Sequence, residues 1–170
     1  QAMVRLMDLQ AARWLIGGEV PGQAGNYHPV GVPTGVYPCR DGSLIIQAAN
    51  NRLYHRLCRA IDAPELIDDP RFATSEIRRG HREELTESIQ AVLVHLPSTE
   101  VLRRLESAHI ANARVNSIRE FLDHPQLAAR DRWHEIDSPA GPIRALLPPV
   151  RLEHVGPVMG NVPALAQDST

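Results

Sequence analysis

A loop rich in glycine and proline holds the residues with the clearest capacity for chemistry. Residues 23–35 contain three glycines and two prolines, so we expect an irregular surface loop, and loops of this length are usually functional or disordered. Small residues let backbone N–H groups come close to an acyl oxygen or a carboxylate. His28 could donate a hydrogen bond to a carbonyl, or act as an acid or a base near neutral pH. The alternative is a structural crossover loop that His28 only packs against or orients.

Other polar clusters give weaker indications of a site. Arg78, Arg79 and Arg82 could bind a phosphate group, but cations at the start of a helix oppose its dipole, so we expect a solvated face there. Asp68 and Asp69 precede a proline, which favours a turn and a helix cap over acid–base catalysis. The eight histidines show no ligand spacing with one another or with cysteine, so we expect no metal site.

The composition excludes several classes of protein. The net charge is -2 and no block of like charges occurs, which argues against nucleic-acid binding. All 18 basic residues are arginine, which excludes a lysine Schiff base and favours bidentate recognition of carboxylate or phosphate, although a genomic bias would have the same effect. The two cysteines match no zinc or redox motif, and nothing resembles a signal peptide or a membrane span. We therefore expect a cytoplasmic protein without membrane contact.

The elements on either side of the loop follow from periodicity. Residues 1–16 show an apolar helical period that begins without a cap residue, and we interpret them as a helix entered midway that ends before a Gly-Gly pair. Residues 36–39 and 44–48 flank an Asp-Gly turn, which predicts a hairpin. Pro38 lacks an N–H group, so the first strand of this hairpin should lie at an edge.

Helices follow the hairpin. Asn50 should cap a helix that ends near Ile61, with Tyr54 on the flank of its buried face. Residues 62–75 should form an ordered connector that Phe72 pins to the core. The later expected elements are helices over 80–95 and from 98 with a cap at Ser98 or Thr99, a strand over 110–115, helical turns over 117–122 and 126–130, and a hairpin of 133–136 with 143–147.

The fold class that these elements indicate is α+β: a small domain with a short, mainly antiparallel sheet flanked by helices and preceded by a long linker helix. Aromatic residues make up only 4% of the chain. Trp14, Tyr37, Phe72 and Trp133 should therefore serve as anchors in the core or in domain contacts.

Several short strings occur in the order and spacing of class III coenzyme A transferases. They are Gly25–Pro29 with Pro33–Tyr37, Leu57–Ile61, Asp69–Phe72, Arg78–Leu85, Val115–Ile118, Asp123–Leu127 and Pro139–Pro142. Each string is weakly specific, but together they span nearly the whole chain. The sequence therefore resembles this family, which includes formyl-CoA transferase, the carnitine and bile-acid CoA transferases and alpha-methylacyl-CoA racemase. One departure is Ile110–Ala113, where many relatives have a proline.

The resemblance implies a domain organisation. Members of the family have a Rossmann-like large domain built from both ends of the chain, and a small domain inserted through two linkers. We accordingly expect residues 1–24 to be a linker helix, residues 25–136 the small domain with a lid-like loop at 25–35, and residues 137–170 the return linker. Most of the large domain would then lie outside this sequence. Two chains interlock as rings in the family, which implies a homodimer for the complete protein.

The resemblance also implies a reaction. In the family an aspartate attacks an acyl-CoA thioester, and CoA passes between carboxylic acids through a mixed anhydride and an enzyme-bound thioester. Asp8 is the only acid in residues 1–16 and its setting differs from the family's nucleophile motif, so we assign no catalytic residue and no metal to this chain. The implied partners are coenzyme A, as acyl-CoA, and a carboxylic acid.

The resemblance selects the loop as the substrate-binding segment, because its equivalent in formyl-CoA transferases closes over the acyl intermediate. The residues selected are Gly25, Asn26, Tyr27, His28, Pro29, Val30 and Gly31. His28, Pro29 and Val30 replace a run of glycines, so the loop should be less mobile and its pocket differently shaped. Two alternatives stay open: alpha-methylacyl-CoA racemisation on the same fold, and a non-catalytic structural or dimerising role for the isolated segment.

Overall fold

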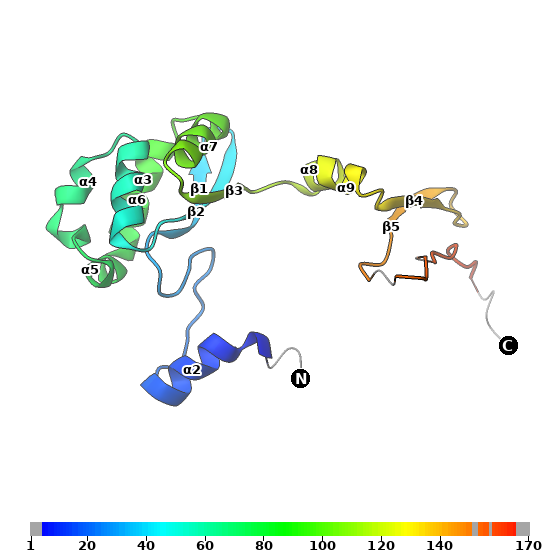
Figure 1. The fold of residues 1–170 in the computed structure, drawn as a ribbon, viewed down its shortest axis with the longest axis horizontal. Coiled ribbons are helices and arrows are strands. Elements are labelled where there is room, and N and C mark those ends of the chain that lie inside the picture. Colours follow the sequence, from blue (N-terminus) through cyan, green and yellow to red (C-terminus); the bar gives the residue numbers. More distant parts are fainter. Residues whose placement is uncertain (1–4, 151–152, 157, 166–170) are drawn as a thin grey trace. The chain divides into compact units, whose positions relative to one another are not determined.

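A three-stranded antiparallel sheet organises the first part of the chain. The computed structural model describes residues 5–150, 153–156 and 158–165, and the chain divides into two units, one ending at Val115 and the other beginning at Asn116 (Figure 1). In the first unit the strands β1 (Thr34–Cys39), β2 (Gly42–Gln47) and β3 (Ala111–Arg114) pair in the order β1-β2-β3. The expected hairpin, the edge position of the Pro38 strand and the third strand are confirmed.

One face of the sheet is packed against helices. Side chains alternate across the strands, so that Tyr37, Leu44 and Ile46 point into the core. The helices are α3 (Asn51–Ala60), α4 (Glu65–Asp68), the 3₁₀ helix η1 (Pro70–Phe72), α5 (Ser75–Gly80), α6 (Arg82–Leu93) and α7 (Ser98–Ser107). Of these, α6 packs on β1, and α7 packs on β2 and β3. The sheet with helical cover confirms the expected α+β class.

Helix α3 begins where the sequence predicts, but its buried face is wider than expected. The Asn50 side chain accepts a hydrogen bond from the Leu53 N–H at 2.8 Å, as a cap does. Tyr54, expected on the flank, is fully buried, and its hydroxyl donates to the carbonyl of Leu66 at 2.6 Å. The prediction for Tyr54 was wrong because its partner is in α4, which the sequence showed only as a connector.

The N-terminus of α7 is also capped from a distance. Neither Ser98 nor Thr99 caps it, because Pro97 occupies the N-cap position and makes no side-chain hydrogen bond there. Instead the carboxylate of Asp41, in the β1–β2 turn, accepts a hydrogen bond from the Ser98 N–H at 2.6 Å. This bond lowers the pKa of Asp41 below its ordinary range. The hairpin turn therefore fixes where α7 starts.

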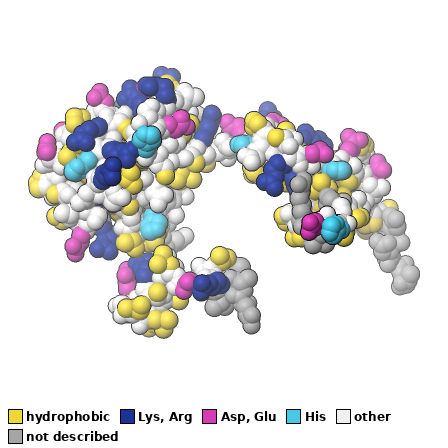
Figure 2. All heavy atoms as spheres, viewed as in Figure 1, with side chains coloured by type: hydrophobic (Ala, Val, Ile, Leu, Met, Phe, Trp, Pro, Cys, Tyr) yellow, Lys and Arg dark blue, Asp and Glu magenta, His cyan; other side chains and the backbone are white. Residues whose placement is uncertain are grey.

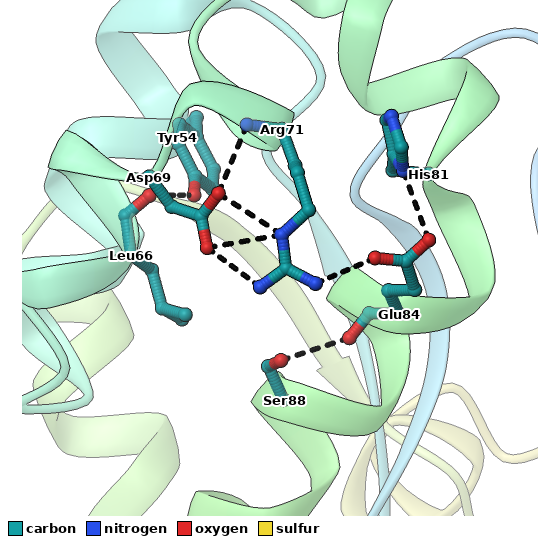
Figure 3. Close-up of polar contacts among 7 residues, drawn as sticks. All are labelled: Tyr54, Leu66, Asp69, Arg71, His81, Glu84 and Ser88. Atoms are coloured by element: carbon teal, nitrogen blue, oxygen red, sulfur yellow. Dashed lines mark hydrogen bonds and ion pairs between the residues drawn. The ribbon is translucent and has the colours of Figure 1, made fainter.

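A polar network orders the connector between α3 and α6 (Figure 3). The guanidinium of Arg71 donates to Asp69 at 2.7 Å and to Glu84 at 2.6 Å, and Glu84 also contacts the Nδ1 of His81 at 2.9 Å. These contacts lower the pKa values of Asp69 and Glu84. Phe72 is fully buried, as expected of the residue that pins this segment. The network joins η1 to the first turn of α6.

Helix α2 precedes the loop and contributes no buried residue. It runs over Asp8–Gly17, shorter than the helix expected over 1–16, of which residues 1–4 lie outside the described residues. Apolar side chains gather on its surface, where Leu15 is 79% and Ile16 is 89% exposed (Figure 2). Trp14 is 54% exposed, so it is not a core anchor of the described chain.

The second unit contains short elements that match the expected ones. They are α8 (Ile118–Leu122), α9 (Pro125–Ala129), and the antiparallel strands β4 (Trp133–Ile136) and β5 (Ile143–Leu146). Ser117 and Glu120 form a reciprocal capping box at the start of α8. Trp133 is half-buried beneath the guanidinium of Arg144. No helix in the described residues of either unit is long and apolar enough to cross a membrane.

Candidate functional site

The Gly25–Gly31 loop folds back along the free edge of β1. The Val36 N–H donates to the Asn26 carbonyl at 3.1 Å, and the His28 N–H donates to the Thr34 carbonyl at 2.9 Å. Tyr27 and Gly35 form an isolated antiparallel bridge between these two bonds. Backbone pairing with β1 therefore gives a defined path to a segment that has no regular secondary structure of its own.

His28 organises the tip of the loop from within. Its Nδ1 accepts hydrogen bonds from the Val30 N–H at 3.1 Å and from the Gly31 N–H at 2.8 Å. An unprotonated Nδ1 is required for this, because a protonated ring nitrogen has no lone pair to offer. Two consecutive backbone donors thus converge on one point. Such a pair of N–H groups is a common anion-binding arrangement in proteins.

Gly31 has little room for a side chain. A Cβ atom at this position would lie 3.0 Å from the Cβ of Ala49 and 3.3 Å from the Nδ1 of His28. Contacts at these distances require the neighbours to shift. The glycine therefore lets the loop pass close to the segment that follows β2.

Tyr27 connects the loop to the sheet and to α6. Its hydroxyl accepts a hydrogen bond from the Nε2 of Gln90 at 3.1 Å, and its ring meets that of Tyr37 edge to face with centroids 6.2 Å apart. A Cβ atom on Gly35 would lie only 2.3 Å from the Tyr27 ring, so this ring position requires glycine in β1. Burial raises the pKa of Tyr37, which therefore stays neutral beneath the loop.

Two arginines that were expected on a solvated face reach the loop instead, and Arg82 is half-buried there. Arg82 donates to the carbonyls of His28 at 2.6 Å and Pro29 at 2.8 Å. Arg78, expected on a solvated face, is 0% exposed, and its Nε donates to the Val32 carbonyl at 3.2 Å. The expectation failed because residues 78 and 79 belong to the separate helix α5, which turns one side toward the core. Arg79 is exposed, as expected.

A cavity of about 570 Å³ lies between the loop, the C-terminal side of α2 and one face of α6. Its lining comprises Arg13, Gly22, Gln23, Ala24, Tyr27, Pro29, Arg82, Glu83, Thr86, Glu87 and Gln90. Tyr27 and Pro29 are the only two of the seven loop candidates among these residues. The lining mixes hydrogen-bond donors with exposed carboxylates, so the cavity suits a polar group that can both donate and accept hydrogen bonds.

Sequence reasoning missed the contribution of α6 to this cavity. Arg82, Thr86 and Gln90 recur every four residues and so share one helical face. That polar stripe was a usable signal. It was overlooked because the apolar stripe of the same helix, which includes Leu85 and Ile89, dominates the pattern. The described residues contain no group of three or more side chains that could hold a metal ion.

Residues 1–169 match the sequence model of CoA-transferase family III. The chain belongs to this family. It is 29% identical over 171 residues to the succinate–glutarate CoA-transferase of Agrobacterium fabrum, covering 92% of this chain and 43% of that protein. Against the succinyl-CoA:glutarate CoA-transferase of Mus musculus the identity is 30%, over 88% of this chain and 35% of the relative.

The fold has solved relatives in the same family. A CaiB/BaiF family protein from Brucella suis superposes with a TM-score of 0.78 at 26% identity, over 98% of this chain and 43% of that structure. The chain thus spans less than half the length of the relatives it matches. The chain has the helix-covered antiparallel sheet that its sequence patterns predicted.

Proposed function

We propose that the protein is an acyl-CoA:carboxylate CoA-transferase in which this chain supplies the linker, the lid-like loop and the small domain. Membership of CoA-transferase family III supports this activity, as do relatives named as CoA-transferases. The substrates are then an acyl-CoA and a carboxylic acid, and coenzyme A is the group transferred. In the family the nucleophilic aspartate precedes the linker helix, and Asp8 is set among residues unlike the family's motif, so the proposal places the nucleophile outside this chain.

The observation that carries a role for the loop is the convergence of two backbone N–H groups. Val30 and Gly31 direct their N–H bonds at one acceptor, which is now the Nδ1 of His28. An acyl oxygen or carboxylate in that position would gain two hydrogen bonds from donors already held in place. In this proposal Gly25, Asn26 and Tyr27 lead the chain to that point, and His28 yields its place to the substrate oxygen.

We further propose residues 1–24 as the linker helix, 25–136 as the small domain and 137–170 as the return linker of a cytoplasmic, interlocked homodimer. Exposed apolar side chains on α2, such as Leu9 and Ile16, support a role for this helix in contacts with another chain or domain. Sedimentation of the full-length protein tests this arrangement. A monomer at micromolar concentration would exclude it.

A substitution at Gly31 tests the loop's part in catalysis. The added Cβ of Gly31→Ala would crowd Ala49 and His28, and Gly31→Trp would fill the site altogether. We expect Gly31→Ala to lower kcat/KM for CoA transfer about tenfold or more, since about 1.4 kcal/mol of lost transition-state stabilisation has that effect. Gly80→Ala is the control, because a Cβ there meets no atom within 4 Å.

The assay follows the appearance of the new acyl-CoA from an acyl-CoA donor and a carboxylate acceptor, using the full-length protein. Unfolding temperatures of the variants separate misfolding from a catalytic defect. Wild-type rates in Gly31→Trp would remove the loop from the mechanism. Exchange of the substrate's α-hydrogen without any acceptor acid would instead indicate a racemase.

A further inference from the structure

The loop's carbonyl groups are held by arginines far away in the sequence. Arg82 donates one hydrogen bond each to His28 and Pro29, across separations of 54 and 53 residues. Arg78 donates to Val32 across 46 residues. These three acceptors lie on both sides of the Val30–Gly31 tip. The backbone that presents the tip is therefore fixed at each end by a guanidinium group.

Arg82 binds the loop in a way that no shorter or neutral side chain reproduces. Its two terminal nitrogens reach two consecutive carbonyls, which requires the planar fork of a guanidinium. Lysine offers a single ammonium nitrogen on a flexible stem. Because consecutive carbonyls are both engaged, the peptide planes at His28 and Pro29 have little freedom to rotate. The Val30 N–H shares a peptide plane with the Pro29 carbonyl, so its direction is set with that carbonyl, and the Gly31 N–H belongs to the next plane along the chain.

Arg78 anchors the loop's exit more deeply. Its terminal nitrogens donate to the Phe72 carbonyl at 2.7 Å and to the Oδ1 of Asn51 at 2.8 Å, and its guanidinium lies 4.2 Å from the centre of the Tyr54 ring. Because the Nε of Arg78 also binds the Val32 carbonyl, Arg78 joins Val32 to α3 and η1.

Among the residues that the structure describes, the partners found for Arg78 are neutral. Burial without a carboxylate disfavours the charged form and lowers the pKa of Arg78. Burying a charged group without an opposite charge beside it costs free energy. Apolar residues at such a position often stabilise the core equally well. The hydrogen bonds of Arg78 nevertheless fix the position of Val32, which follows Gly31 in the chain.

We infer that Arg78 and Arg82 are positioning residues that hold the backbone of the Gly25–Gly31 loop so that the Val30 and Gly31 N–H groups face one point. This inference rests on the proposed function of the loop. Arg82 acts at the entry of the tip and also lines the cavity. Arg78 acts at the exit and does not line the cavity.

Hydrogen exchange of the loop amides tests the inference without relying on activity. The full-length protein is compared as wild type, Arg82→Gln, Arg82→Lys and the control Arg79→Gln, in which the altered side chain is exposed. We expect Arg82→Gln to accelerate exchange of the Val30 and Gly31 amides about tenfold or more, since two charge-assisted hydrogen bonds are lost. The exchange rate of these amides in Arg82→Lys should fall between the rates in wild type and in Arg82→Gln. The rate in Arg79→Gln should match that of wild type.

Exchange at the wild-type rate in Arg82→Gln would overturn the inference. Arg78→Met is a second variant, which should accelerate exchange of the Val32 and Thr34 amides and lower the unfolding temperature. If it fails to fold, the Arg82 comparison still decides. CoA transfer measured on the same samples separates the two claims: faster exchange with a lower kcat supports both, whereas faster exchange with unchanged transfer supports the positioning role and refutes the loop's part in the reaction.

Discussion

Gly35→Ala is the sharpest test of how the sheet edge positions the site. Gly35 lies in β1 directly opposite Tyr27. A Cβ atom there would lie 2.3 Å from the Tyr27 Cδ1, 2.9 Å from the Asn26 carbonyl oxygen and 3.0 Å from the Tyr27 Cε1. Two of these atoms belong to a ring and one to the backbone, so no flexible side-chain end can move aside. Tyr27 must leave its place.

The structure sets the size of the effect. Displacing the ring removes its edge contact with Tyr37 and the hydrogen bond from Gln90, and strains the adjacent backbone pairing. Overpacking of this kind costs about 1–3 kcal/mol. Alanine restricts the unfolded chain, which offsets about 0.4–1 kcal/mol of that cost. We expect a net loss of about 1–2 kcal/mol, or about 4–8 °C in the unfolding temperature of the unit.

Urea and thermal unfolding of Gly35→Ala measure this loss, with Gly80→Ala as the control. Near-ultraviolet circular dichroism should also change, because the Tyr27–Tyr37 contact is disturbed. In the control we expect no destabilisation, since the new Cβ is unobstructed and alanine favours a helix over glycine. A Gly35→Ala protein as stable as wild type, with an unchanged tyrosine spectrum, would refute this account of the Tyr27 position.

Three further predictions follow from single contacts. Tyr54→Phe leaves the buried Leu66 carbonyl without its donor and should lower the free energy of unfolding by about 1–3 kcal/mol in urea; an unchanged midpoint would contradict the role of this bond. Hydrogen bonds from two arginines lower the pKa of Glu100 from 4.5 to about 2, so its stabilising effect is present above pH 4.5 and lost as the pH falls toward 2. In acid unfolding, Glu100→Gln should therefore lose less stability than wild type between pH 4.5 and pH 2. Equal losses in the two proteins would contradict the stabilising role of the Glu100 carboxylate. His28→Phe removes the acceptor for the Val30 and Gly31 N–H groups, whose hydrogen exchange should accelerate; unchanged protection of both amides would show that another acceptor holds them.

Local patterns in the sequence predicted most elements of the fold. The Asp-Gly turn, the Asn50 cap and the helical turn after Ser117 involve residues at most a few positions apart, so their chemistry is visible without the fold. Pro38 identified the edge strand for the same reason. Family membership was likewise predictable, because it depends on the order of short strings along the chain.

Contacts between distant segments could not be predicted in this way. The cap of α7 comes from Asp41, and the partner of Tyr54 is a carbonyl in α4. Arg78 was expected on a solvated face because a cation at the start of a helix opposes its dipole, and only the meeting of α5 with the loop and α3 gives it acceptors. In each case a polar group is satisfied by an atom whose position depends on packing.

For the candidate site the sequence by itself determined the loop, its glycines and the histidine at its centre. The sequence also shows that the chain contains no lysine and that it carries the short strings typical of the family. The tertiary structure decided which donors and acceptors surround that loop: Gln90 beneath Tyr27, Arg82 on the carbonyls, and His28 folded onto the tip. The physical reason is that residue type fixes what a group can bind, whereas the approach of α6 to the edge of β1 fixes what lies within reach.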